Sequence, residues 1–215
     1  THYVEKLREI ADRKLASLKD NYGDGVQTHL LLGKSTDGII NFAEQQHFDL
    51  IVMGTKGSWG LKETLSGSET QRIARRSKIP VLSLMCDRSD LNISNILLVN
   101  NFSHPAAENL TLVKKFIAAF NSKIHLLQIR NGKEEVEAIE ARMKKFAELN
   151  NLSNYACHVI SDKDVESGVI HFNQMNDMDI ISIGTHGKGG LFHHSETEKL
   201  INHLFKPILS FHLNN

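Results

Sequence analysis

A glycine-rich stretch between two short apolar segments carries the clearest chemistry in the sequence. Gly54 and Gly57 follow the apolar run Leu50–Val52, and Gly67 and Ser68 come just before a segment of helical composition. Glycine lets backbone N–H groups approach an anion closely, and the first turn of a helix offers free N–H donors at the positive end of its dipole. A strand, a glycine loop and a helix start in this order predict a phosphate-binding site.

The spacing of the loop differs from the two common nucleotide motifs. No Gly-Lys-[Ser/Thr] follows the glycines, and three closely set glycines are absent. The pattern Gly-x2-Gly-x9-Gly-[Ser/Thr] resembles the ATP-binding signature of the universal stress protein family, as do the strand before it and the Pro-Val-Leu strand after it. The resemblance implies that ATP or a related adenine nucleotide binds here, with Mg²⁺ as an optional companion. By position, the phosphates would contact Gly54, Gly57, Gly67 and Ser68, with the Met53 backbone near the ribose and adenine.

A purely structural interpretation of the same residues stays open. Ser68 and Gln71 have the spacing of a capping box, in which two side chains satisfy the first N–H groups of a helix, and Gly67 would then only make the turn. Glu69 in the first helical turn suits the helix dipole but repels a phosphate. The cationic side chains that could offset this repulsion are Lys56, Lys62 and Arg72.

Composition restricts the compartment and the partners. The 215 residues carry 25 basic and 25 acidic side chains, which favours neither nucleic acid nor an acidic membrane surface as a partner. No apolar run has the length of a membrane span, and Cys86 and Cys157 look like free thiols in a reducing compartment. We therefore expect a soluble, cytoplasmic protein. Because the chain starts at Thr1, we also expect residues before it in the native protein.

Two parts of the chain resemble each other. Asp49–Gly57 reads DLIVMGTKG and matches Asp179–Gly187, DIISIGTHG, at an offset of 130 residues. Further on, Ser68–Gln71 matches Ser195–Glu198 at an offset of 127, so the second glycine loop is three residues shorter. Segments in a shared order at a shared offset predict a duplicated unit. The first copy would span residues 1–88 and the second residues 92–215, joined by a short polar link at Asp87–Leu91.

Each copy is expected to be a doubly wound α/β sandwich, because strands alternate with helices along the chain. The resemblance implies a fold like that of the adenine nucleotide alpha hydrolases, with strand order 3-2-1-4-5. The first copy lacks counterparts of Ser94–Arg130, so its sheet would have no middle, and we expect a missing N-terminal segment. In the first copy, helices are expected at 3–18, 37–47 and 69–77 and strands at 28–32, 50–52 and 81–84. In the second, strands are expected at 95–99, 124–129, 155–160, 179–183 and 208–211, and helices at 105–120, 133–149, 165–175 and 195–205.

The second glycine loop departs from the family's pattern. His194 aligns with Gly67, and a histidine lacks glycine's backbone freedom. Asn101 occupies the position at which the family places an adenine-contacting Asp. We therefore predict that the second copy holds no triphosphate. A metal site built on His186, His193, His194 and His203 is disfavoured, since surface histidines and a capping box from Ser195 to Glu198 explain the same residues.

The resemblance also predicts how the copies meet. Family members pair through their last strands about a two-fold axis, here Val81–Leu84 and Ile208–Phe211, each preceded by a proline at a sheet edge. We expect an antiparallel contact between these strands within one chain, and a further homodimer stays open. No catalytic constellation is readable. The resemblance implies a regulatory or sensing role in stress response rather than turnover. An adenine-nucleotide hydrolase and a nucleotide-independent interaction module are the alternatives.

Overall fold

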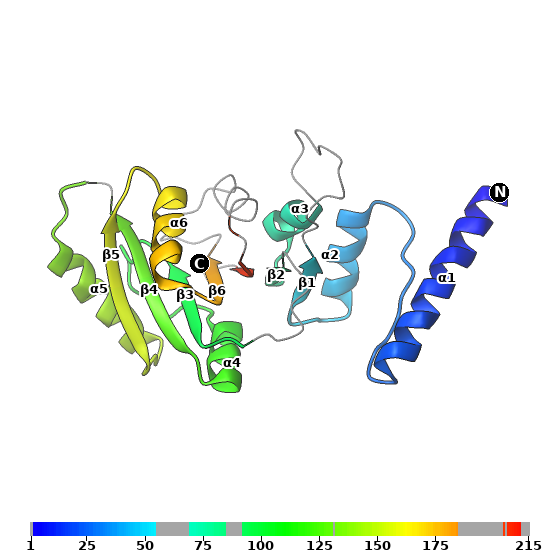
Figure 1. Ribbon diagram of the computed structural model, residues 1–215, viewed down its shortest axis with the longest axis horizontal. Coiled ribbons are helices and arrows are strands. Elements are labelled where there is room, and N and C mark those ends of the chain that lie inside the picture. Colours follow the sequence, from blue (N-terminus) through cyan, green and yellow to red (C-terminus); the bar gives the residue numbers. More distant parts are fainter. Residues whose placement is uncertain are drawn as a thin grey trace. The chain divides into compact units, whose positions relative to one another are not determined.

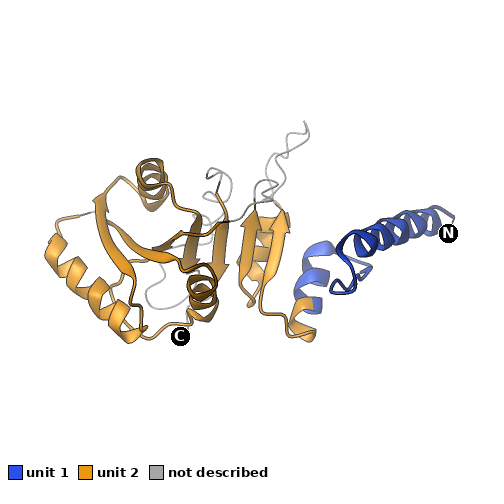
Figure 2. Cartoon of the chain, turned by 60° about the horizontal axis from the view of Figure 1, so that its bottom comes forward, with its two compact units in different colours: residues 1–42 blue, residues 43–215 orange. Residues whose placement is uncertain are grey.

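The computed structural model describes residues 2–54, 69–84, 92–130, 132–184, 204 and 206–211 (Figure 1). The chain divides into two compact units, residues 1–42 and residues 43–215 (Figure 2). Gly57, Gly67, Ser68, Cys86, the link at Asp87–Leu91 and the second glycine loop lie outside the described residues. The division into copies at residues 1–88 and 92–215 stays a prediction.

The first compact unit holds helix α1 (His2–Tyr22) and the larger part of helix α2 (Ser35–Gln45). No residue of α1 is buried, although the helix carries apolar side chains at helical spacing. The expected strand at residues 28–32 is wrong, because residues 26–32 form no regular secondary structure. Its counterpart in the second copy pairs with a neighbouring strand, and the first copy has no equivalent of that neighbour. A strand without a partner leaves its backbone groups unpaired, so it does not form.

The second compact unit is built on a seven-stranded sheet with the order β1-β2-β7-β6-β3-β4-β5. The second copy supplies the last five strands, and their order, renumbered within the copy, is the expected 3-2-1-4-5. Every strand pair is parallel except β2 with β7. The strands are β1 (Ile51–Gly54), β2 (Val81–Leu84), β3 (Asn95–Val99), β4 (Lys123–Arg130), β5 (Tyr155–Ser161), β6 (Ile180–Gly184) and β7 (Ile208–Phe211).

Helices cover both faces of this sheet. Helices α4 (Thr111–Phe120) and α5 (Val136–Leu149) bury apolar side chains such as Val113 and Met143 against one face, where the core includes Leu98 and Leu126. Helix α6 (Val165–Asn176) packs on β4 and β5 from the other face, where Gly168 lies against Ile129. Helix α3 (Glu69–Arg76) packs against β2. These are the layers expected of a doubly wound α/β protein.

The antiparallel junction between β2 and β7 confirms the expected contact between the last strands of the two copies. Leu82 faces Leu209, Val81 faces Ser210 and Ser83 faces Ile208. At the offset of 127 residues, Leu82 and Leu209 are equivalent positions, and the two flanking pairs exchange equivalent residues. A two-fold axis through Leu82 and Leu209 therefore relates the two strands.

The strand pairs on either side of the junction have the same register. Ile51 pairs with Val81 in the first copy, and the equivalent Ile181 pairs with Ile208 in the second. The same backbone hydrogen bond begins both pairs, since Ile51 N donates to Pro80 O and Ile181 N donates to Pro207 O, both at 2.9 Å. This agreement in register is what a duplicated unit predicts.

Helices α4 and α5 both start later than expected, α5 at Val136 instead of residue 133 and α4 by a wider margin. The helix predicted from residue 105 begins at Thr111, because the side chain of Asn150 binds the segment before it. Asn150 Oδ1 accepts from Glu108 N at 2.8 Å, and its Nδ2 donates to Ala106 O at 2.8 Å. Backbone groups held in this way cannot form the first helical turn.

Candidate functional site

The carboxyl end of β1 carries the first half of the candidate phosphate site. Met53 is half-buried and Gly54, the last residue of the strand, is exposed. A Cβ atom built on Gly54 would meet no atom within 4 Å among the described residues. The described residues therefore leave the Gly54 backbone unobstructed on this side, as close approach of a phosphate requires.

Helix α3 supplies the second half of the site. Thr70 lies in the first turn of α3, is buried, and its Oγ1 donates to Gly54 O at 3.5 Å. The contact is long for a hydroxyl donor, yet it places the N-terminus of α3 directly at the end of β1. Strand end and helix start thus meet as the glycine motif predicts, and the first N–H groups of α3 lie where an anion is stabilised.

The charge of Glu69 is offset as expected. Arg72 Nη2 lies 2.6 Å from Glu69 Oε2, three residues apart on α3. Because the guanidinium neutralises this carboxylate, Glu69 repels a phosphate less than an unpaired glutamate would. The two other cations proposed for this role, Lys56 and Lys62, lie outside the described residues.

The structure describes only part of the predicted site. Met53 and Gly54 are placed at the end of β1, whereas Gly57, Gly67 and Ser68 are not described. Gln71, the partner of Ser68 in the proposed capping box, is buried in the first turn of α3. Thr70 was missed by the sequence reasoning. The available signal was a hydroxyl in the first turn of a helix that starts beside a glycine loop.

In the second copy, the residues at the end of β3 bind one another. Asn101 Oδ1 accepts from Ser103 N at 3.0 Å and from Ser103 Oγ at 2.9 Å. Asn100 is buried, and its Oδ1 accepts from Asn101 N at 2.7 Å. Phe102 has a left-handed backbone with φ of 48° and packs edge-on against Phe146. The acceptor oxygen of Asn101 is thus already used in a local turn.

The described residues offer little for other site chemistry. They contain no group of three or more His, Cys, Asp or Glu side chains that could hold a metal ion. Cys157 is a free thiol, as expected, and burial raises the pKa of that thiol, which keeps it protonated and unreactive. No helix in the described part of the chain has the length and hydropathy needed to cross a membrane.

Comparison with known proteins identifies the family of the first part of the chain. Residues 2–84 match the model of the Universal stress protein family. The universal stress protein MJ0531 of Methanocaldococcus jannaschii is 37% identical over 70 residues, which are 33% of this chain and 41% of that protein. Residues 2–84 belong to the universal stress protein family. The universal stress protein MJ0577 of the same organism is 35% identical over 80 residues, 36% of this chain and 49% of that protein.

The fold of the whole chain agrees with this assignment. A universal stress protein of known structure from Archaeoglobus fulgidus superposes with a TM-score of 0.74 at 17% identity, covering 100% of this chain and 80% of that one. At this identity the likeness concerns the fold alone. The chain spans less than half the length of the two curated universal stress proteins above.

Proposed function

We propose that the first copy binds ATP or a related adenine nucleotide through Met53, Gly54, Gly57, Gly67 and Ser68, and that binding serves a regulatory or sensing role in stress response. The observation that carries this proposal is the contact between Thr70 in the first turn of α3 and Gly54 at the end of β1. It brings together the two halves of a motif whose intervening loop has the spacing of the family's ATP signature.

Two further features support an anionic ligand. Among the described residues, no atom lies within 4 Å of a Cβ built on Gly54, which leaves that side of the Gly54 backbone open to a ligand as far as they extend. The pairing of Glu69 with Arg72 offsets the negative charge nearest the helix start. When bound, Mg²⁺ would neutralise phosphate charge, while the residues of this chain would supply backbone N–H donors and the positive end of α3.

Binding without turnover is the form of the proposal that the described residues favour. Hydrolysis needs a group that activates water beside the phosphates, and the described part of the site contributes only backbone groups, the Thr70 hydroxyl and the paired Glu69. An adenine-nucleotide hydrolase is the second candidate, because the family resemblance implies a fold like that of the adenine nucleotide alpha hydrolases. Phosphate release during incubation with ATP distinguishes the two.

Isothermal titration calorimetry with ATP, ADP and AMP tests the proposal. Wild-type protein should release or absorb heat with one site per chain, and Gly54→Val should lose that heat, since the new side chain fills the space beside the strand end. Gly25→Val is the matched control. A Cβ at Gly25 also meets no described atom within 4 Å, and Gly25 lies far from the motif in the sequence. Absence of heat with every nucleotide would overturn the proposal and favour a nucleotide-independent interaction module.

The second copy is proposed to hold no triphosphate. Its glycine loop is three residues shorter, His194 replaces a glycine, and Asn101 is bound to Ser103. Two equal sites per chain in the same titration would contradict this asymmetry.

A further inference from the structure

A row of three polar side chains crosses the sheet on the face that α6 covers. Asn95, His125 and His158 come from the neighbouring strands β3, β4 and β5, and we call them the histidine row. His125 Nε2 lies 3.2 Å from Asn95 Oδ1, and His125 Nδ1 lies 2.9 Å from His158 Nε2. The planes of the two imidazoles are 12° from parallel and their centroids are 5.1 Å apart, so the rings meet edge to edge. The row therefore ties three strands together through side chains.

The far end of the row supports α6. The ring of His158 packs on Phe172 of α6 at a centroid distance of 4.9 Å. Among the described strands, β5 lies at the end of the strand order and pairs with β4 alone. Helix α6 packs on these same two strands (Figure 1). His158 thus belongs to β5 and contacts α6 through Phe172.

The hydrogen bonds determine where protons sit at neutral pH. Asn95 Oδ1 can only accept, so His125 Nε2 carries a proton and His125 Nδ1 accepts the Nε2 proton of His158. A first added proton can bind His158 Nδ1 without breaking either bond. A second must bind His125 Nδ1, where two N–H groups would then face each other and two positive charges would be in contact. The row accordingly tolerates one proton and breaks on the second.

A neighbouring positive charge also disfavours protonation of the two histidines. Lys123, two residues before His125 on β4, lowers the pKa of both histidines, in each case as a smaller contribution than burial. Asp179 Oδ2 accepts from the backbone N–H groups of Ser94 and Asn95 at the start of β3, and is not hydrogen-bonded to either ring of the row.

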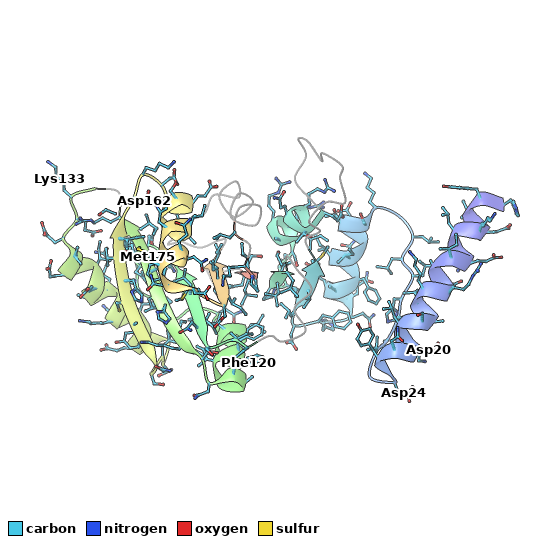
Figure 3. All side chains as sticks on the ribbon, viewed as in Figure 1. Asp20, Asp24, Phe120, Lys133, Asp162 and Met175 are labelled. Atoms are coloured by element: carbon cyan, nitrogen blue, oxygen red, sulfur yellow. The ribbon has the colours of Figure 1, made fainter. Side chains whose placement is uncertain are left out.

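The carboxylates on and beside α6 contact groups other than the histidine row or lie some distance from it. Asp162, labelled in Figure 3, has its Oδ2 2.6 Å from His171 Nδ1 of α6. Glu166 lies in the first turn of α6, six residues before Phe172, which is about 9 Å along a helix axis. Among the described residues, no carboxylate forms a hydrogen bond or ion pair with His125 or His158 that would balance a second proton.

We propose that the histidine row is an acid-sensitive latch, which holds β5 and α6 on the sheet while at most one of its histidines is protonated and releases them when both are. The latch lies in the second copy and does not depend on nucleotide binding by the first. Acidification would loosen one edge of the protein while β3 and β6 stay in place.

Nuclear magnetic resonance on the wild-type protein tests the latch directly. The ring carbon and proton shifts of His125 and His158 should titrate in two separate steps, His158 first, both below the ordinary value of 6.5 and the second near 4. Amide protection factors, corrected for intrinsic exchange, should fall about tenfold or more in β5 and α6 across the second step and stay unchanged in β3 and β6. Independent titration of both rings near 6.5 would overturn the proposal.

Variants separate the latch from general acid sensitivity. His158→Phe keeps an aromatic ring against Phe172 but loses both the bond to His125 and the second proton site. Protection of β5 and α6 should therefore be lower than in wild type at neutral pH and should not fall further as the pH drops to 4. His104→Gln is the control, because it removes an exposed histidine outside the row and should behave as wild type. If His158→Phe loses protection as wild type does, the row is not the latch. If this variant fails to fold, the wild-type titration still decides.

Discussion

Gly168 of α6 packs tightly against Ile129 of the sheet, and its replacement by alanine gives a quantitative test of the packing. A Cβ on Gly168 would lie 2.6 Å from Ile129 Cδ1 and 2.9 Å from both Ile129 Cγ1 and Cγ2. Ile129 is buried on β4 and its β-branched side chain is stiff, so the whole side chain or the helix must move. Overpacking of this kind costs roughly 1–3 kcal/mol, and the better helix propensity of alanine returns about 1 kcal/mol. We expect Gly168→Ala to lower the free energy of unfolding by up to about 2 kcal/mol.

The duplication supplies a matched control. Gly38 in α2 is equivalent to Gly168 at the offset of 130 residues, and both N–H groups donate to the carbonyl four residues earlier. A Cβ on Gly38 would meet only Leu31 Cδ1, at 4.0 Å. Gly38→Ala should therefore raise stability by about 0.5–1 kcal/mol through helix propensity alone.

Urea unfolding of both variants, with a double-mutant cycle, decides the point. In an Ile129→Ala background the alanine at position 168 should no longer clash, so the coupling energy of Gly168→Ala with Ile129→Ala should exceed about 0.5 kcal/mol. The reasoning is refuted if Gly168→Ala stabilises the protein as Gly38→Ala does, or if the two substitutions at positions 129 and 168 are additive.

Three other predictions follow from contacts of single side chains. Unfolding free energy should fall as the pH drops from about 6.5 to about 4, because the folded-state pKa of His125 is lowered to about 4, chiefly by burial, and the unfolded chain takes up the proton first. Since the ring is partly exposed, the loss should be about 1–2 kcal/mol, and His125→Gln should flatten it, as urea unfolding across this pH range measures. Asn150→Ala should cost about 2–4 kcal/mol, because the buried amide binds three backbone groups at 2.8–2.9 Å; a loss under about 1 kcal/mol in thermal unfolding would contradict this. Thr70→Val should weaken nucleotide binding measured by calorimetry while Thr70→Ser retains it, and equal affinities would show that the contact with Gly54 does not position α3.

The sequence reasoning succeeded where a short apolar run is bounded by polar residues or proline. Val81–Leu84, Asn95–Val99 and Ile208–Phe211 were predicted with the bounds that the structure has. Such runs are buried on both faces of a parallel sheet and cannot pack otherwise. The pairing of the first of these strands with the last followed from the family resemblance and from their edge positions, and the structure confirms it.

The errors arose where a segment depends on a distant partner. Residues 28–32 have the composition of a strand but no neighbouring strand, and the segment before Thr111 is held by Asn150, about 40 residues later. The histidine row was also invisible, because His125 and His158 meet only through the register of β4 and β5. Local pattern cannot reveal contacts that register and missing partners determine.

The antiparallel junction has a consequence for the proposed asymmetry of binding. Strands β1 and β2 run opposite to β6 and β7. The carboxyl ends of β1 and β6 therefore lie at opposite ends of the strands, one at the top and one at the bottom of the sheet. Strands of four and five residues rise about 3.3 Å per residue, so Gly54 and Gly184 are separated by roughly the height of the sheet. A ligand bound beside Gly54 therefore does not block the site beside Gly184. Binding of one nucleotide per chain would therefore reflect the residues of the two glycine loops, and the three-residue difference between them, rather than obstruction of one site by the other.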